Sequence, residues 1–245
     1  MIIEQNKISK IALLPSPFYF YDMELLNRTL QELVSQANKY NYHVHYAFKA
    51  NVNERVLSLI QSFGLGADCV SGGEIKMALE NSFSAHQIVF AGVGKSDAEI
   101  KTALDADIAY FNCESVQEIE VINEIALSQN KKARIALRIN PNIDAKTHKH
   151  IATGTETTKF GIFMGNLQEA IDTVHISEAL SLVGLHFHIG SQILDLSTYV
   201  DLCERINSIQ SELEKQGISV PIINVGGGLG VDYLNPEANP IADFK

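Results

Sequence analysis

The chain has 245 residues, of which 46% are hydrophobic and 20% charged, a composition typical of a globular protein with a large core. Its formal net charge of −10, from 29 acidic and 19 basic residues without a basic run, argues against nucleic acid and anionic membranes as partners. Three scattered cysteines without a CxxC pair, no signal-like start and no apolar stretch of membrane-spanning length predict a reduced, soluble, cytoplasmic protein with no metal site.

Residues 1–22 precede the first predicted helix, and we expect them to form an extended N-terminal arm that ends in a proline- and aromatic-rich motif. Beyond the arm, seven apolar, β-branched runs predict strands. They lie at residues 43–48, 67–70, 87–91, 108–112, 134–139, 182–189 and 220–225. No low-complexity linker or internal repeat separates them.

Segments between the strands have helical periodicity, and several of their ends carry recognisable signals. The first helix has one apolar face, formed by Leu26, Leu30, Leu33, Val34 and Ala37. Three capping boxes predict helix starts, since a serine and a glutamate three residues later satisfy each other's unpaired backbone donors. They pair Ser71 with Glu74, Ser96 with Glu99, and Ser115 with Glu118. Gly217 predicts the stop of a helix over residues 197–216.

Apolar strands that alternate with amphipathic helices indicate an α/β fold, in which helices cover a parallel sheet. Both an open doubly wound sheet and a (β/α)8 barrel fit this pattern. A barrel needs eight strands and roughly 250 residues. We therefore expect residues 23–245 to form a TIM-type (β/α)8 barrel that stops before its last strand.

Lys49 directly follows the first predicted strand and is the first candidate for chemistry. In a barrel, functional side chains gather at the C-terminal ends of the strands and in the loops that follow. Surrounding walls can dehydrate an amine there, which weakens its preference for the charged form and lets it condense with an aldehyde as a Schiff base. A solvated lysine at a strand end is the alternative, since most lysines are exposed.

A run of glycines, Gly226, Gly227 and Gly228, directly follows the last predicted strand. Without Cβ atoms in the way, their backbone N–H groups can approach an anion closely. A phosphate is the usual guest of such a loop late in a barrel. A flexible turn is the alternative interpretation.

Two histidines, His186 and His188, share one face of the sixth predicted strand because side chains alternate along a strand. His188, nearer the C-terminal end, could lie flat against an aromatic ligand ring, and Ser191 beyond it could donate to a phosphate. Binding of a metal and packing in the core are the alternatives. No nearby carboxylate or thiol completes a set of metal ligands.

Arg138 lies within an apolar strand, and a buried arginine needs an anion nearby. Asp68 at the end of the second strand could be this anion or a contact of a cofactor. The long segment 140–165 after the fifth strand is typical of a substrate or interface loop. Its basic side chains are Lys146, His148, Lys149, His150 and Lys159.

Eight motifs, spread over nearly the whole chain, together resemble one family. They are Ser16-Pro17-Phe18-Tyr19-Phe20-Tyr21-Asp22, Tyr46-Ala47-Phe48-Lys49-Ala50-Asn51, Asp68-Cys69-Val70-Ser71-Gly72-Gly73-Glu74, Phe111-Asn112-Cys113-Glu114-Ser115, Arg138-Ile139-Asn140-Pro141, Lys159-Phe160-Gly161, His186-Phe187-His188-Ile189-Gly190-Ser191-Gln192 and Gly226-Gly227-Gly228. In this order they are similar to the fold-type III pyridoxal-phosphate-dependent decarboxylases. Gln192 resembles the branch that acts on meso-diaminopimelate, whereas ornithine-type relatives usually carry glycine there.

The resemblance implies a role for each matching position. Lys49 would hold pyridoxal 5'-phosphate as an internal aldimine, and His188 would stack on the pyridine ring, so that these two residues are the catalytic candidates. The cofactor-binding set would comprise Lys49, Asp68, Arg138, His188, Ser191, Gly226, Gly227 and Gly228. No metal would be required.

The resemblance also implies decarboxylation of meso-2,6-diaminopimelate to L-lysine and carbon dioxide, a step of lysine biosynthesis. It implies a homodimer with shared active sites and a C-terminal β-domain after the barrel. Two alternatives stay open. One is a decarboxylase of another basic amino acid, such as ornithine or arginine, and the other is a non-catalytic barrel that binds pyridoxal phosphate.

The chain departs from the family at its end. The family's last barrel strand has a Glu-Pro-Gly-Arg-like segment, whose acid keeps the pyridine nitrogen protonated, and no such segment precedes Lys245. The family's later cysteine, tyrosine and substrate-binding arginines would also lie beyond this residue. We therefore expect a fragment of a longer protein, which on its own releases little or no carbon dioxide from meso-diaminopimelate. Robust release by the 245 residues alone would contradict this expectation.

Overall fold

Parallel strands form one curled sheet in the computed structural model, which describes residues 5–143 and 160–234. The strands are β1 (His45–Ala47), β2 (Gly66–Cys69), β3 (Ile88–Phe90), β4 (Tyr110–Cys113), β5 (Ala133–Asn140), β6 (Ile162–Phe163), β7 (Leu180–His186) and β8 (Ile222–Asn224). Their order is β1-β2-β3-β4-β5-β7-β8, and the short β6 pairs with the end of β5 outside this path. Every pairing is parallel.

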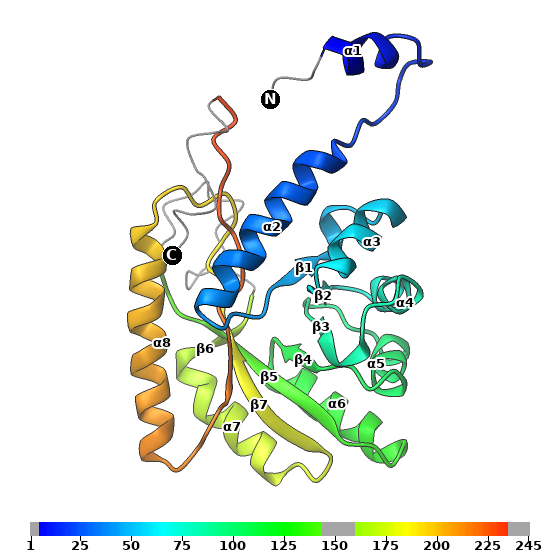
Figure 1. The fold of residues 1–245 in the computed structure, drawn as a ribbon. Coiled ribbons are helices and arrows are strands. Elements are labelled where there is room, and N and C mark those ends of the chain that lie inside the picture. The colour runs from blue at the N-terminus through cyan, green and yellow to red at the C-terminus, as the bar shows by residue number, and fades with distance from the viewer. Residues whose placement is uncertain (1–4, 144–159, 235–245) are drawn as a thin grey trace.

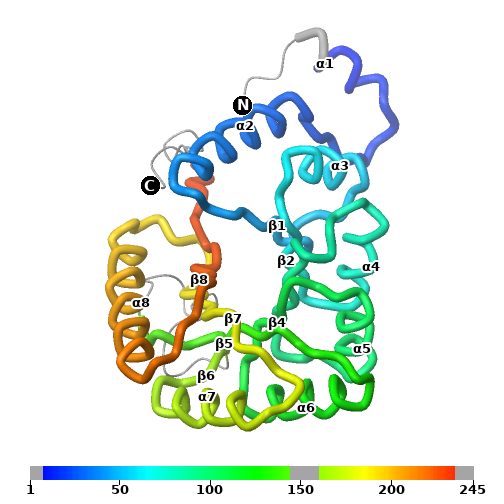
Figure 2. The backbone as a smooth tube through the Cα atoms, turned by 60° about the horizontal axis from the view of Figure 1, so that its bottom comes forward, coloured from blue at the N-terminus to red at the C-terminus, as the bar shows by residue number. Residues whose placement is uncertain are grey.

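Helices cover the outer side of the curled sheet (Figure 1), and the end-on view shows them as a ring around the strands (Figure 2). The α-helices are α1 (Gln5–Ile11), α2 (Met23–Lys39), α3 (Glu54–Ser62), α4 (Gly72–Glu80), α5 (Asp97–Asp105), α6 (Val116–Ser128), α7 (Leu167–Ile176) and α8 (Ser197–Lys215). Three single turns of 3-10 helix are η1 (Phe48–Ala50), η2 (Ala85–Gln87) and η3 (Met164–Asn166).

The predicted fold class is confirmed. A curled parallel sheet with outer helices is consistent with a (β/α)8 barrel that lacks its last strand within the described residues, where β1 and β8 form the two edges of the sheet. The seven predicted strands correspond to the seven strands of the main path, and β6 was not predicted. The first strand is shorter than expected, because the chain turns into η1 at Phe48.

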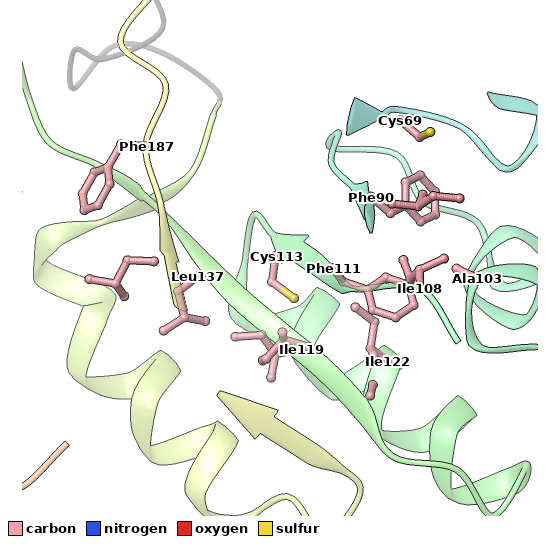
Figure 3. Packing of buried hydrophobic residues seen from close by; sticks show 14 of the residues in the cluster. Cys69, Phe90, Ala103, Ile108, Phe111, Cys113, Ile119, Ile122, Leu137 and Phe187 are labelled. Atoms are coloured by element: carbon pink, nitrogen blue, oxygen red, sulfur yellow. The ribbon is translucent and has the colours of Figure 1, made fainter. Parts of the chain in front are cut away.

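Alternation of side chains along each strand divides the interior into two layers. One face packs against the helices, as Figure 3 shows for Phe90, Phe111 and Leu137 beside the helical residues Ile119 and Ile122. The other face lines the inside of the curl, where a smaller apolar cluster holds Val89, Tyr110 and Ala136. The outer layer supplies most of the buried apolar surface. Towards the ends of the strands, the inner layer contains polar side chains.

The predicted helix starts are confirmed, but two capping boxes differ from the expected pattern. At Ser96 the box is complete, with Glu99 Oε2 accepting from the Ser96 N–H at 3.0 Å. At Ser71 and Ser115 the serine hydroxyl accepts from the backbone three residues on. The glutamate, however, accepts from the residue before the cap: Glu74 binds the N–H of Val70 at 2.7 Å, and Glu118 binds that of Glu114 at 2.6 Å. These carboxylates therefore fix the strand end as well as the helix start.

The N-terminal arm is only partly extended. Residues 5–11 form α1, where the N–H of Ala12 donates to the carbonyl of Ile8 at 2.9 Å in the helical pattern. Residues 12–22 contain turns and irregular backbone. Asp22 then caps α2, because its carboxylate accepts from the N–H groups of Glu24 and Leu25. The expectation of an extended arm over residues 1–22 is thus wrong for α1.

Candidate active site at the C-terminal ends of the strands

Lys49 lies in η1, one turn beyond the end of β1, and its side chain is exposed. The expected dehydration of this amine by surrounding walls is therefore not present among the described residues. Phe48 beside it is fully buried and makes an edge contact with Phe83, with ring centroids 5.2 Å apart. The buried phenylalanine anchors the turn, and the lysine next to it is exposed.

Asp68 and His188 are both within range of the Lys49 charge, which lowers the pKa of each of them. Burial raises the pKa of Asp68 to about 6, while Lys49 and Arg138 oppose this rise and Glu74 adds to it. Burial and the cations Arg138 and Lys49 lower the pKa of His188 to about 4. The structure thus brings together four predicted site residues from different strands.

The direct anionic partner of Arg138 is Glu114, which follows β4. Arg138 Nη1 donates to Glu114 Oε1 at 2.5 Å, and the two side chains are 8% and 5% exposed. The guanidinium also lies over the Phe160 ring, 5.0 Å from its centroid. Asp68, the partner considered from the sequence, is instead a neighbour whose pKa the Arg138 charge lowers.

His186 is the last residue of β7, two positions before His188, and it is buried in the core. Burial, followed by the charge of Arg138, lowers its pKa well below the usual value, so that the ring is neutral. Its Nδ1 and both polar side-chain atoms of Asn112 are buried without a hydrogen-bond partner. Among the described residues there is no group of three His, Cys, Asp or Glu side chains that could hold a metal ion.

The glycine loop after β8 packs tightly against the backbone after β7. A Cβ added to Gly226 would lie 2.3 Å from the carbonyl oxygen of Phe187, and one on Gly228 would lie 2.2 Å from that of Gly190. Both glycines have positive φ, +74° and +105°. Close approach and left-handed backbone therefore both require glycine at these two positions. The interpretation of this run as a merely flexible turn does not account for that packing.

The N–H groups of this loop are partly engaged within the protein. Gly226 donates to Asn224 Oδ1 at 2.9 Å, and the N–H of Gly227 lies 3.5 Å from His188 Nδ1. The site for an anion at Gly226, Gly227 and Gly228 stays a prediction. Ser191 follows β7 in the neighbouring loop and is exposed.

Gln192 joins the two loops. Its side-chain amide donates to the carbonyl of Val231 at 2.5 Å, and its side-chain oxygen accepts from the N–H of Val231 at 3.1 Å. Ile193 and Leu229 form a parallel bridge beside this contact. A glycine at position 192 could make neither of these side-chain hydrogen bonds. The residue that distinguishes this chain from ornithine-type relatives therefore connects the two loops.

Sequence reasoning missed two buried charges at the same end of the sheet. Glu114 was only part of a motif, although an acid directly after an apolar strand is the signal that could have marked it as the partner of a buried arginine. Lys95 was not considered, and its side chain is 1% exposed with Glu118 at 2.6 Å. The basic residues Lys146, His148, Lys149, His150 and Lys159 lie outside the described residues.

Comparison with known proteins identifies the family. A family model described as the pyridoxal-binding domain of pyridoxal-dependent decarboxylases matches residues 24–244. The chain belongs to this family. The curated diaminopimelate decarboxylase of Bacteroides thetaiotaomicron is 50% identical over 239 residues, which are 97% of this chain and 62% of that protein.

Solved structures of pyridoxal-dependent decarboxylases have the same fold. Diaminopimelate decarboxylase from Helicobacter pylori, complexed with L-lysine, has a TM-score of 0.90 at 41% identity, covering 98% of this chain and 61% of that chain. The diaminopimelate decarboxylase from M. jannaschii in complex with L-lysine has a TM-score of 0.86 at 34% identity, covering 93% and 54%. The present chain thus spans about three-fifths of the length of these relatives.

The residues present fit pyridoxal phosphate, the cofactor of this family. Lys49 offers an amine at the strand ends, and the glycine loop has backbone positions from which Cβ atoms are excluded. His188 and Asp68 carry shifted pKa values beside that amine, as expected of a functional site. No helix in the described part of the chain has the length and apolar character needed to cross a membrane.

We predict that Gly228→Ala destabilises the protein by at least about 2 kcal/mol, because the new Cβ meets the Gly190 carbonyl and the backbone is left-handed. Gly227→Ala is the matched control, since nothing lies within 4 Å of its added Cβ. Its effect is expected to stay within about 0.5 kcal/mol. Denaturant unfolding of both variants measures the difference, and equal stabilities would contradict the packing described here.

A second prediction concerns the pH dependence of stability without cofactor. The raised pKa of Asp68, about 6 against 3.8, makes its contribution to stability fall as pH rises from 4 to 6. The lowered pKa of His188, about 4 against 6.5, makes its contribution rise as pH rises from 4 to 6.5. In the wild-type protein the two terms oppose each other.

Relative to wild type, Asp68→Asn is therefore expected to gain about 2 kcal/mol of unfolding free energy between pH 4 and pH 6. His188→Gln is expected to lose about 2 kcal/mol relative to wild type between pH 4 and pH 6.5. Urea unfolding at a series of pH values checks both slopes. If the unfolding free energy of both variants followed pH in parallel with wild type, the assignment of these pKa shifts to Asp68 and His188 would be wrong.

Proposed function

We propose that the protein carrying this chain uses pyridoxal phosphate to decarboxylate meso-2,6-diaminopimelate to L-lysine and carbon dioxide. The observation that carries the proposal is the grouping of Lys49, Asp68, Arg138 and His188 at one end of the barrel. The similarity to diaminopimelate decarboxylases over 97% of the chain supports it. Pyridoxal phosphate, when bound, supplies an electron sink for the pair left by the departing carboxylate.

Each residue of the chain has a distinct part in this proposal. Lys49 Nζ is the amine that would hold the cofactor through its aldehyde group. His188 presents a neutral ring at neutral pH, because its pKa is lowered to about 4. A neutral ring packs against a flat ligand without repelling the cationic groups around it. This fixes the ligand plane, which is an orientation effect.

The anionic part of the ligand belongs at the glycine loop and Ser191. Backbone N–H groups and a serine hydroxyl are suitable donors for a phosphate. Arg138 adds positive charge, which Glu114 partly neutralises. Burial raises the pKa of Asp68 to about 6, and the charge of Lys49 acts on its carboxyl group, which makes Asp68 the candidate to exchange a proton with the ligand.

We also propose that the protein is a cytoplasmic homodimer with shared active sites and that it serves lysine biosynthesis. Exposed apolar side chains near the glycine loop support a contact with a second surface. They are Val225, Val231 and Leu234, which are 42%, 48% and 98% exposed.

The decisive experiment measures carbon dioxide release by the intact protein from meso-diaminopimelate, lysine, ornithine and arginine. We expect the rate with meso-diaminopimelate to exceed each other rate at least tenfold. Faster release from ornithine or arginine would support the alternative substrate class. Visible absorbance of bound pyridoxal phosphate without any carbon dioxide release would support a non-catalytic binding protein.

Lys49→Ala is expected to abolish both the visible absorbance of the bound cofactor and the reaction, because the amine that would hold the cofactor is removed. Lys76→Ala is the matched control, since Lys76 is a surface lysine on α4 whose side chain is 75% exposed. If both variants behaved like wild type, Lys49 would not be the residue that holds the cofactor.

A further inference from the structure

We propose that Glu114 is a positioning residue, which holds the Arg138 guanidinium and the turn at Gly161 in one fixed arrangement at the candidate active site. The inference rests on the proposed function, because the value of the arrangement lies in binding pyridoxal phosphate. It adds a residue to which neither the motifs nor the comparisons give a role.

Both carboxylate oxygens of Glu114 are used. Oε1 accepts from Arg138 Nη1 at 2.5 Å, and Oε2 accepts from the backbone N–H of Gly161 at 3.0 Å. The side chain of Glu114 is only 5% exposed. A buried carboxylate with two different donors couples their positions, since neither donor can move away without leaving a buried charge less satisfied.

Gly161 belongs to the end of the connection between β5 and β6, and it lies directly on β5. Its φ is +78°, and a Cβ there would lie 3.1 Å from the carbonyl oxygen of Arg138 and from the N–H nitrogen of Asn140. Phe160 places its ring under the Arg138 guanidinium. At the end of this connection, the backbone at Gly161 and the ring of Phe160 therefore pack against Arg138. Glu114 contacts Arg138 as well.

A second buried pair fixes the backbone of Glu114. Glu118 Oε2 accepts from the Glu114 N–H at 2.6 Å, while Glu118 Oε1 accepts from Lys95 Nζ at 2.6 Å. Lys95 Nζ also donates to the carbonyls of Gly92 and Asn112 at 2.7 and 2.8 Å. The Lys95 side chain is 1% exposed. The loop after β3 and the segment between β4 and α6 are thus tied together behind Glu114.

Arg138 transmits this arrangement to the reacting end of the barrel. Its charge lowers the pKa of both Asp68 and His188, so its position affects the electrostatic potential at these two residues. Removing the Glu114 carboxylate would leave the guanidinium less neutralised and free to reorient. We therefore expect the altered site to bind the cofactor more weakly and to carry a different charge.

The test uses the intact protein with Glu114→Ala and Glu114→Gln. In the cofactor-free state, hydrogen exchange of the Gly161 amide is expected to accelerate at least about tenfold in Glu114→Ala, because a hydrogen bond to a buried carboxylate is lost. Glutamine keeps the volume but offers one oxygen for two donors. The affinity for pyridoxal phosphate, followed by its visible absorbance, is expected to fall at least about fivefold in both variants.

Glu99→Ala is the matched control. Its carboxylate also joins two loops, accepting from the N–H groups of Gly72 at 2.8 Å and Ser96 at 3.0 Å, but it does not contact Arg138. Both readouts should stay within twofold of wild type in this variant. A response as large as that of Glu114→Ala would reduce Glu114 to a general stabiliser and overturn the proposal.

Other outcomes separate the inference from the proposed function. Unchanged Gly161 exchange in Glu114→Ala, or unchanged affinity for pyridoxal phosphate in both Glu114 variants, overturns the positioning role. If the wild-type protein binds no pyridoxal phosphate, the proposed function fails. In that case Gly161 exchange alone decides whether Glu114 holds the turn, and its positioning role for the cofactor is withdrawn.

Discussion

The candidate site depends on one geometric constraint, the parallel direction of all strands in the sheet. Parallel strands bring their carboxyl ends to the same end of the barrel, and the alternation of side chains sends every second residue there to the inner face. Residues from β2, β5 and the segment after β7 therefore meet, although the first and last of them, Asp68 and His188, are 120 positions apart in the chain. Antiparallel pairing of any one strand would move its polar end to the opposite side.

Electrostatic balance is the second property of this end of the sheet. Burial raises the pKa of Asp68 and lowers that of His188, while the charges of Lys49 and Arg138 lower both pKa values. Burial drives each of them towards its neutral form. The structure thus places a carboxyl group whose pKa is raised to about 6 and an imidazole whose pKa is lowered to about 4 at the same end of the sheet as the Lys49 amine.

The fold and the location of the site could be predicted from the sequence, but the pairing of its charges could not. Apolar strands, the serine caps and Gly217 are local signals, so the order of elements and the barrel class followed from them. Arg138 was recognised as a buried cation, yet Glu114 rather than Asp68 contacts it. Which acid faces which strand depends on the register of β4 against β5, which no short segment encodes. The exposure of Lys49 and the helix α1 were likewise not evident from local patterns.

The glutamates that cap helices have a further consequence for the dynamics of the barrel. Glu99 reaches from α5 to the start of α4, and Lys95 reaches from the loop before α5 to Glu118 on α6. Each contact joins neighbouring helix starts, so we expect α4, α5 and α6 to open together rather than one at a time.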